Sequence, residues 1–425
     1  MLRTPSDFAA LSAAPGVTTP LLGVRHRTVV ATESTPSLRL GIATSRKVGN
    51  AVVRNRIRRR LKSIARELAP HYMEWEEAGI SPRSIFSEAG KYGFLGFQIP
   101  EKFDGGGTDD FRFNAIIAER LQYAGMASAS TGITLHNDIT IPYFLELGTD
   151  EQKERWLPGI ASGELITAIA MTEPGTGSDL QAMKTTAKKD GNHYVINGSK
   201  TYITNGQNAD LILVCVKTDT EIQPAYKGMS IVLVEADREG FKRGRNLDKI
   251  GMDEADTSEL FFEDVRVPMT NCLGEEGKGF IYLMSELPQE RLSIAVSSMA
   301  STQKAFDETV AFCRDRIVFG KPLLDFQNTR FVLADIKSKL QVGWAHLDWA
   351  LNRHYKKELT AEEGAAAKLW HTELQWEVVD ACLQLHGGAG YMNEYPIARM
   401  WRAARVTRIF GGTNEIMKEL IGRGL

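Results

Sequence analysis

The chain has 425 residues, of which 43% are hydrophobic and 24% charged. These proportions are typical of a globular protein and exclude wholesale disorder. At about 150 residues per domain, the length predicts roughly three domains. The net charge of −2 excludes a uniformly basic nucleic-acid-binding protein.

The cysteines lie far apart and form no cluster with histidine, so we expect neither a metal site nor a disulfide, and a reducing compartment. They are Cys215, Cys272, Cys313 and Cys382. No run of about 18 apolar residues predicts a membrane span. The first 20 residues lack the apolar stretch of a signal peptide.

Charge is distributed unevenly along the chain. Residues 1–66 contain 13 lysines and arginines but two acidic residues, a net charge of +11 that leaves −13 for the other 359 residues. Such asymmetry indicates segments with different partners. The basic segment would be attracted to phosphate groups, whereas the acidic remainder would not.

The predicted elements begin with two β-strands, at 24–32 and 37–44, where β-branched residues alternate. Residues 50–78 then have the apolar periodicity of a helix with arginines on its other face. Residues 82–170 are typical of helices separated by glycine-rich turns, and residues 180–268 of short antiparallel strands. Long amphipathic helices are predicted to follow at 278–315, 326–355, 361–387 and 394–420. Because βαβ units are absent, the pattern disfavours a Rossmann fold and predicts an α+β fold.

The N-terminal segment contains the run SRKVGNAVVRNRIRRRL at 45–61. A helix with so many arginines offers a phosphate-binding face for structured RNA. The run closely resembles the signature of the bacterial ribonuclease P protein subunit. That resemblance implies a bacterial, cytoplasmic protein and assigns RNA contacts to Arg46, Lys47, Arg54, Arg56, Arg58, Arg59 and Arg60.

The resemblance stops near Leu61–Arg66, about halfway through such a subunit. A domain cut in half loses buried area that a small core needs. We therefore expect residues 1–66 to be a truncated extension that arose by gene fusion or by a mis-joined reading frame. RNA binding in tRNA 5′ processing, and a fusion without function, stay open as alternatives.

Three runs dominate the rest of the chain: AMTEPGTGSDL at 170–180, QLHGGAGY at 384–391 and RIFGGTNEI at 408–416. Together and in this order they resemble the acyl-CoA dehydrogenase family over about residues 67–425. The run SELPQERL at 285–292 is most similar to the long-chain subgroup of that family.

The resemblance implies the architecture of that family. It predicts an N-terminal α-helical domain at 67–168, a middle antiparallel β domain at 169–270 and a C-terminal four-helix bundle at 271–425, after the basic α/β extension 1–66. It also implies a homotetramer, with FAD bound at a subunit interface and electron-transfer flavoprotein as the electron acceptor. An acyl-CoA oxidase of related fold, which passes electrons to O₂, is a less favoured alternative.

Acyl-CoA dehydrogenation removes a proton from the α-carbon and a hydride from the β-carbon of the acyl chain. The reaction needs a carboxylate base, a flavin that accepts the hydride, and donors that polarise the thioester carbonyl. The resemblance implies a long-chain or branched fatty acyl-CoA as substrate and the trans-2-enoyl-CoA as product. The pathway would be fatty acid β-oxidation or branched-chain catabolism.

The base departs from the commonest form of the family, which has a glutamate where this chain has Gly411. The long-chain and isovaleryl subgroups place the base in the helix that opens the C-terminal domain, and the resemblance therefore assigns it to Glu290. Glu286, one helical turn away, and Glu415 are the alternatives. An apolar pocket should raise the pKa of the base and make it a better proton acceptor.

The resemblance also assigns the contacts of the cofactor and the substrate. Flavin contacts are expected from Met171, Thr172, Gly177, Ser178, Tyr202, Ile203, Thr204, Arg316, Phe319, Gln327, Gln384, Gly387, Gly388, Thr413 and Glu415. Substrate contacts are expected from Ser178, Pro288, Gln289, Arg291, Leu292, Gly411 and Gly412. The backbone N–H of Gly411 would polarise the thioester carbonyl, and His136 is expected to be structural.

Overall fold

The computed structural model describes residues 16–18, 22–28, 38–44 and 71–425, with side chains from residue 71 onward. The chain separates into two compact units, Met1–Ile64 and Ala65–Leu425. In the first unit, an antiparallel sheet has the strand order β1-β2-β3, formed by β1 (Gly16–Thr18), β2 (Leu22–Thr28) and β3 (Leu38–Thr44). The two strands expected here are confirmed as β2 and β3.

The helix predicted over 50–78 lies mostly outside the described residues, and α3 (Tyr72–Ala78) is its described end. The seven basic residues of the expected RNA-binding face also lie outside them.

Helices dominate the chain from α3 to the start of the main sheet, as predicted. They are α4 (Ser84–Lys91), α5 (Arg112–Tyr123), α6 (Ala127–Thr134), α7 (Ile141–Leu147) and α8 (Asp150–Ser162). A capping box starts α8, where the Thr149 hydroxyl accepts from the Gln152 N–H and the Gln152 side chain accepts from the Thr149 N–H. Between α6 and α7, Leu135–Thr140 is π-helical, a distortion often found near functional sites.

The central sheet has the strand order β11-β8-β7-β5-β6-β10-β9, and β4 also pairs with β7. The strands are β4 (Thr167–Ala170), β5 (Thr186–Asp190), β6 (His193–Thr204), β7 (Leu211–Lys217), β8 (Met229–Glu235), β9 (Phe241–Asn246), β10 (Thr257–Pro268) and β11 (Cys272–Leu273). The sheet is mixed rather than purely antiparallel as predicted, because β4 and β5 pair with β7 in parallel. The apolar runs of β7 and β8 are buried on both faces, which explains why they do not alternate.

The C-terminal part is a bundle of α9 (Gly279–Asp315), α10 (Gln327–Tyr355), α11 (Ala361–His386), α12 (Pro396–Thr407) and α13 (Asn414–Gly422). The small hairpin of β12 (Ile317–Val318) and β13 (Lys321–Pro322) joins α9 to α10. The single helix predicted at 394–420 is wrong: two helices are separated by a turn. Gly411 and Gly412 in this turn have φ of 63° and 89°, which a right-handed helix does not accommodate.

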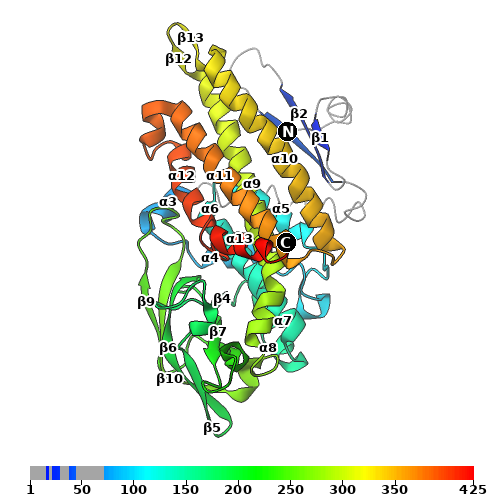
Figure 1. Ribbon diagram of the computed structural model, residues 1–425, viewed down its shortest axis with the longest axis vertical. Helices are drawn as coiled ribbons and strands as arrows, with labels where there is room; N and C mark the ends of the chain where they lie inside the picture. Colours follow the sequence, from blue (N-terminus) through cyan, green and yellow to red (C-terminus); the bar gives the residue numbers. More distant parts are fainter. Residues whose placement is uncertain (1–15, 19–21, 29–37, 45–70) are drawn as a thin grey trace. The chain divides into compact units, whose positions relative to one another are not determined.

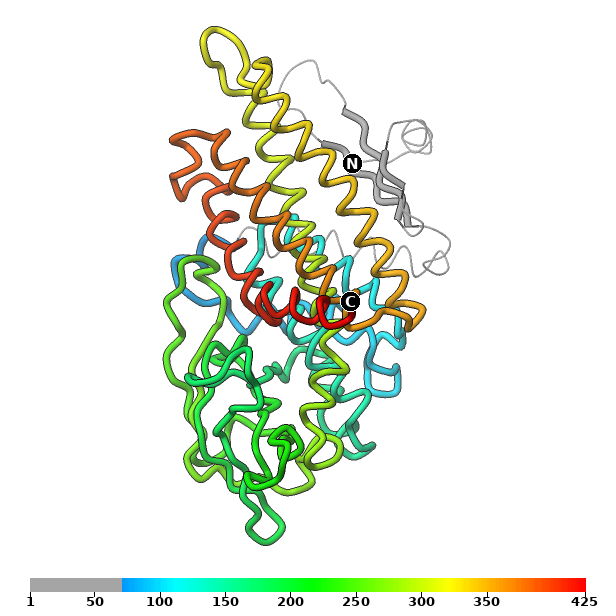
Figure 2. Tube along the Cα trace, viewed as in Figure 1, coloured from blue at the N-terminus to red at the C-terminus, as the bar shows by residue number. Residues whose placement is uncertain are grey.

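The longest helix, α9, connects the sheet with the bundle (Figures 1 and 2). Its 37 residues span about 55 Å at the usual rise of 1.5 Å per residue. Leu283 belongs to the apolar core between the sheet and α7–α8, whereas Leu292, Val296 and Met299 belong to the core of the bundle. The residues between Leu283 and Leu292 therefore lie where the two cores meet.

A buried ion pair fixes the loop that follows β4. Lys200 Nζ lies 2.9 Å from Glu173 Oε1 and 3.0 Å from the Met171 carbonyl oxygen. The side chain of Lys200 is 0% exposed and that of Glu173 is 6% exposed. Glu173 also accepts from the backbone N–H groups of Lys184 and Thr185. The loop thus depends on two opposite charges that compensate each other away from water.

We expect Lys200→Met to lower the free energy of unfolding by about 3–5 kcal/mol, because Glu173 would remain buried without its counter-charge. Urea and thermal denaturation would measure the loss. The matched control is Lys242→Met, which removes an ion pair to Glu263 between side chains that are 60% and 65% exposed. The control should change stability by less than about 1 kcal/mol. Equal losses in the two variants would contradict this prediction.

Candidate active site

Glu290 is a buried carboxylic acid in the middle of α9. It is 5% exposed, and its Oε1 accepts a hydrogen bond of 3.1 Å from the hydroxyl of Tyr143 in α7. Burial raises the pKa of Glu290 to about 7, while the Tyr143 hydrogen bond and the Arg291 guanidinium act in the opposite direction. This environment makes Glu290 a candidate general base near neutral pH.

Two other acidic residues were alternatives for the same role. Glu286 lies one turn before Glu290 and is also buried, and burial together with the Glu146 carboxylate raises its pKa well above the usual range. Glu286 therefore retains its proton to higher pH than an ordinary carboxyl. Glu415 is exposed at the start of α13, where a hydrogen bond from its own backbone N–H, followed by one with Thr413, lowers its pKa. Because the Glu415 carboxylate is solvated and weakly basic, it is the poorest proton acceptor of the three.

The turn that carries Gly411 packs against α9 beside Glu290. A Cβ atom at Gly411 would collide with Ile294, which lies one helical turn after Glu290. The backbone N–H of Gly411 donates to no group in the described part of the chain. The fold thus brings a buried carboxylate and an available backbone donor to one place from segments more than 100 residues apart.

Lys368 of α11 stabilises the Gly411 turn through hydrogen bonds. Its ammonium donates to the Gly412 carbonyl oxygen at 2.8 Å and to Asn414 Oδ1 at 2.7 Å, and its side chain is fully buried. Burial and the nearby Arg291 guanidinium lower the pKa of Lys368 to about 7. Asn414 in turn donates to Thr372 and Glu373. This network fixes the conformation of residues 411–414.

The other residues of α9 that are expected to contact substrate take part in packing or are buried in the structure. Gly364 of α11 lies against Pro288, since a Cβ there would come within 3.1 Å of the Pro288 Cα. The Gln289 amide donates to the Asp138 carbonyl oxygen at 2.7 Å. Leu292 is completely buried in the bundle core, and Arg291 is buried with an Nε that has no hydrogen-bond partner in the described residues.

The loop that contains the run AMTEPGTGSDL, residues 170–180, is hydrogen-bonded at its start and exposed at its end. Glu173 and Thr176 exchange two backbone hydrogen bonds, of 3.0 and 3.1 Å. Beyond this turn, Gly177 and Ser178 are exposed, and a Cβ at Gly177 would meet no atom within 4 Å. A flat group can therefore approach this backbone closely. Met171 and Thr172 are half-buried beside it.

The expected flavin contacts at the end of β6 differ in exposure. Tyr202 is 68% exposed at a φ of 60°, whereas Ile203 is buried in the sheet core and Thr204 is half-buried. Only the first and last of these side chains are accessible to a bound group in this conformation.

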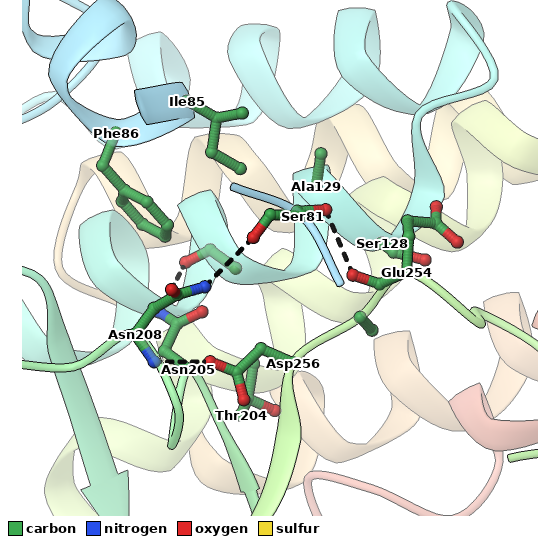
Figure 3. A pocket seen from close by; sticks show the side chains of 12 residues that line it. Ser81, Ile85, Phe86, Ser128, Ala129, Thr204, Asn205, Asn208, Glu254 and Asp256 are labelled. Carbon is green, nitrogen blue, oxygen red and sulfur yellow. Dashed lines mark hydrogen bonds between the residues drawn. The ribbon is translucent and has the colours of Figure 1, made fainter. Parts of the chain in front are cut away.

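The turn after Thr204 is tied down on its inner side, at a small pocket that Thr204 helps to line (Figure 3). Asn208 donates from its amide to the Ser81 carbonyl at 3.1 Å and from its backbone to Asp256 Oδ2 at 2.8 Å. The Ser81 hydroxyl donates to the Glu254 carbonyl oxygen. These bonds hold the turn and with it the orientation of Tyr202 and Thr204.

A third group of expected flavin residues lies on the bundle. Arg316 and Gln327 lie on either side of the β12–β13 hairpin and Phe319 lies in its turn. All three are exposed, Phe319 to 93%. Gln384, Gly387 and Gly388 are exposed at the end of α11. Thr413 caps α13 by accepting from the Ile416 N–H. The β12–β13 hairpin lies at the opposite end of the bundle from the sheet (Figure 1), so the structure does not bring it together with Tyr202 in one chain.

Several buried polar residues at the site were not anticipated from the sequence. Tyr143, Lys368 and Asp138 do not belong to any of the motifs named above. The signal that could have identified them is a polar residue within an otherwise apolar run. His136 is structural as expected: it is buried, bonds the Ile160 carbonyl and Thr167, and burial lowers its pKa to about 4. Among the described residues no acidic, histidine or cysteine cluster could hold a metal ion.

Comparison with known proteins identifies the family. Models of the acyl-CoA dehydrogenase C-terminal, middle and N-terminal domains match residues 277–425, 168–265 and 54–164. The mitochondrial long-chain specific acyl-CoA dehydrogenase of Sus scrofa is 46% identical over 362 residues, which cover 85% of this chain and 84% of that protein.

Solved structures agree. An acyl-CoA dehydrogenase from Geobacillus kaustophilus matches with a TM-score of 0.86 and 45% identity, over 90% of this chain and 99% of that one. A glutaryl-CoA dehydrogenase from Mycobacterium smegmatis in complex with FADH2 matches with a TM-score of 0.81 and 25% identity, over 89% and 96%. The chain belongs to the acyl-CoA dehydrogenase family, whose members are FAD-binding oxidoreductases that act on the CH–CH group of acyl-CoA.

The N-terminal segment matches a second family. A model of ribonuclease P matches residues 2–82, which confirms the expected resemblance. The match continues past Arg66, where the resemblance was expected to stop, and overlaps the acyl-CoA dehydrogenase match from residue 54 onward. Residues 54–82 are therefore similar to both families. No helix of the described segments is long and apolar enough to cross a membrane.

The pKa of Glu290 predicts how the reaction depends on pH. If Glu290 is the base, it acts only in its ionised form, and the rate of flavin reduction at limiting substrate should rise with pH to a midpoint near 7 and then level off. Rapid-mixing spectroscopy between pH 5.5 and 9 would measure this.

Stability should show the opposite trend. The folded-state pKa lies above the ordinary value of 4.5, so ionisation of Glu290 opposes folding as pH rises from about 4.5 through about 7. Glu290→Gln should therefore be more stable than the parent at pH 8, with a gain that shrinks as the pH falls and vanishes below about pH 4.5. A midpoint near 4.5 for both measurements would contradict this assignment.

Proposed function

We propose that this chain is an FAD-dependent dehydrogenase that converts a long-chain or branched fatty acyl-CoA into the trans-2-enoyl-CoA. The observation that carries the proposal is the burial of Glu290 beside the Gly411 turn. A proton acceptor with a raised pKa and an unengaged backbone donor are the two groups that α-proton removal next to a thioester requires.

In the proposed reaction, the Glu290 carboxylate takes the α-proton of the acyl chain. The Gly411 N–H donates to the thioester oxygen and stabilises the negative charge that develops there. Bound FAD would supply the acceptor for the hydride that leaves the β-carbon. Burial keeps water away from Glu290, which strengthens these interactions and preserves its basicity.

The residues proposed to hold FAD are those that the family resemblance assigns. At the flavin these are Met171, Thr172, Gly177, Ser178, Tyr202, Ile203 and Thr204. The open space beside Gly177 and the exposure of Tyr202 fit a flat ring system. Arg316, Phe319, Gln327, Gln384, Gly387, Gly388, Thr413 and Glu415 would hold the diphosphate and adenosine. The separation of the β12–β13 hairpin from the sheet supports a site shared between two copies, in a homotetramer.

We place the domain boundaries near residues 66, 168 and 270. The second and third boundaries lie close to the limits of the middle-domain match, residues 168–265, whereas the N-terminal-domain match already begins at residue 54. Electron-transfer flavoprotein is the proposed acceptor, and the bacterial cytoplasm the proposed location. The similarity of SELPQERL and of the Sus scrofa relative supports a long-chain substrate.

Anaerobic titration of the purified holoenzyme tests this proposal. Palmitoyl-CoA or isovaleryl-CoA should bleach the flavin absorbance, and butyryl-CoA should do so poorly. Glu290→Gln should bind FAD and acyl-CoA normally but lower the rate of flavin reduction about 10²–10⁴-fold, because the general base is lost.

The matched control is Glu308→Gln on the same helix, where Glu308 pairs with Lys304 at the surface. It should leave the rate unchanged. Flavin that no acyl-CoA bleaches would contradict the proposed reaction, and retained reduction in Glu290→Gln would reject Glu290 as the base. Oxygen consumption without another acceptor would indicate an oxidase.

A second function, RNA binding by the N-terminal segment, is proposed because the ribonuclease P model matches residues 2–82. Arg54, Arg56, Arg58, Arg59 and Arg60 would contact phosphates, so affinity should fall steeply with salt.

A gel shift of the full chain with a ribonuclease P RNA transcript tests this function. Changing all five arginines to alanine should weaken binding at least about tenfold and flatten its salt dependence. Lys337→Ala, which removes one exposed positive charge from the bundle, is the control and should bind normally. Binding that is unaffected by the five changes would contradict the proposed RNA face.

A further inference from the structure

Tyr143 is a fully buried phenol for which the proposed reaction gives no role. It lies in α7, which packs against α9, and its hydroxyl donates to Glu290 Oε1 at 3.1 Å. A phenylalanine would fill almost the same space. The hydroxyl group is therefore present at a position where it has to find a polar partner, and that partner is the proposed base.

We propose that Tyr143 is a positioning residue for the reaction, whose hydroxyl holds the Glu290 carboxylate in one orientation and favours its ionised form. The inference rests on the proposed function of Glu290 as the base. A phenol O–H stabilises a carboxylate acceptor more strongly than a neutral carboxyl. A fixed carboxylate also loses less freedom when the α-carbon of a substrate arrives.

The other groups of α9 and α7 do not take this role. Arg291 favours the ionised form of Glu290 by its charge but makes no hydrogen bond with it. Glu286 opposes ionisation of its neighbours and interacts mainly with Glu146. Tyr143 is the one hydrogen-bond donor to Glu290 in the described residues.

Groups on the remaining elements make no hydrogen bond with Glu290 in the described residues. Cys215 of β7 faces Glu290, but burial raises the pKa of its thiol to about 12. Lys200 of β6 is paired with Glu173. Asp138, in the π-helical stretch, accepts from Ser293 at 2.5 Å, and burial raises its pKa to about 7, but it makes no hydrogen bond with Glu290.

On α11, Lys368 faces Arg291 and the Gly412 carbonyl rather than Glu290. Without the Tyr143 hydroxyl, the Arg291 charge would be the one remaining group that opposes the rise in the pKa of Glu290 caused by burial.

The experiment compares the pH dependence of flavin reduction in the parent and in Tyr143→Phe, at limiting acyl-CoA and with the holoenzyme. The loss of a donor to the carboxylate should move the midpoint upward by roughly one pH unit. The variant should then be about tenfold slower on the acidic limb and close to the parent above pH 9. An unmoved midpoint, or an equal loss of rate at every pH, would overturn the proposal, because the latter is the signature of a packing defect.

The matched control is Tyr123→Phe. The Tyr123 hydroxyl also donates to a carboxylate on α9, Asp307 Oδ2, at 2.5 Å, but far along the helix from Glu290. This variant loses the same kind of bond and should keep the parent midpoint. A shift as large as that of Tyr143→Phe would overturn the proposal.

Site-specific replacement of Tyr143 by 3-fluorotyrosine retains the hydroxyl and decides the matter if Tyr143→Phe does not fold. The more acidic phenol is a stronger donor and should move the midpoint downward. An upward shift or no shift would overturn the proposal.

A second readout is independent of turnover. Thermal midpoints of the parent, Tyr143→Phe, Glu290→Gln and the double variant give the coupling between the two side chains, which should be larger at pH 8 than at pH 5.5. Coupling that is absent at pH 8 would overturn the proposal. Flavin reduction that survives Glu290→Gln rejects the proposed base itself, whereas a dead Glu290→Gln with an unshifted Tyr143→Phe rejects this inference alone.

Discussion

Burial of the Glu290 carboxyl group is the constraint on which the rest of the site depends. A carboxylate removed from water is unstable unless other groups compensate its charge, and full compensation would make it a weak base. The structure supplies one hydrogen bond from Tyr143 and the nearby charge of Arg291. This partial compensation leaves the pKa of Glu290 near neutrality, where a carboxylate is both available and basic.

The position of that carboxyl group is set by one helix that belongs to two cores. α9 contributes Leu283 to the core under the sheet and Leu292 to the bundle, so the intervening turn is held from both sides. Pro288 interrupts the hydrogen bonding of the helix there, and Gly364 allows α11 to pack directly on it. Close packing of this kind leaves Glu290 little freedom to move.

The Gly411 turn is the second half of the site and needs its own support. Two residues with left-handed φ leave backbone groups unpaired by helix formation, and the buried ammonium of Lys368 satisfies the Gly412 carbonyl. A glycine at position 411 removes a side chain that could act as base but retains the N–H. The proposed base and the proposed backbone donor lie on two segments, so bundle packing sets their relative placement.

Periodicity in the sequence predicted most helical and β segments, the motifs carried the acyl-CoA dehydrogenase resemblance, and that resemblance assigned Glu290 as the candidate base. The break between α12 and α13 and the parallel pairing of β4 with β7 were missed, because turn conformation and strand partners depend on distant contacts. Only the tertiary structure joined Tyr143 to Glu290, which are 147 residues apart. A pKa and a hydrogen-bond partner are fixed by burial and proximity in space, and neither can be read from local sequence.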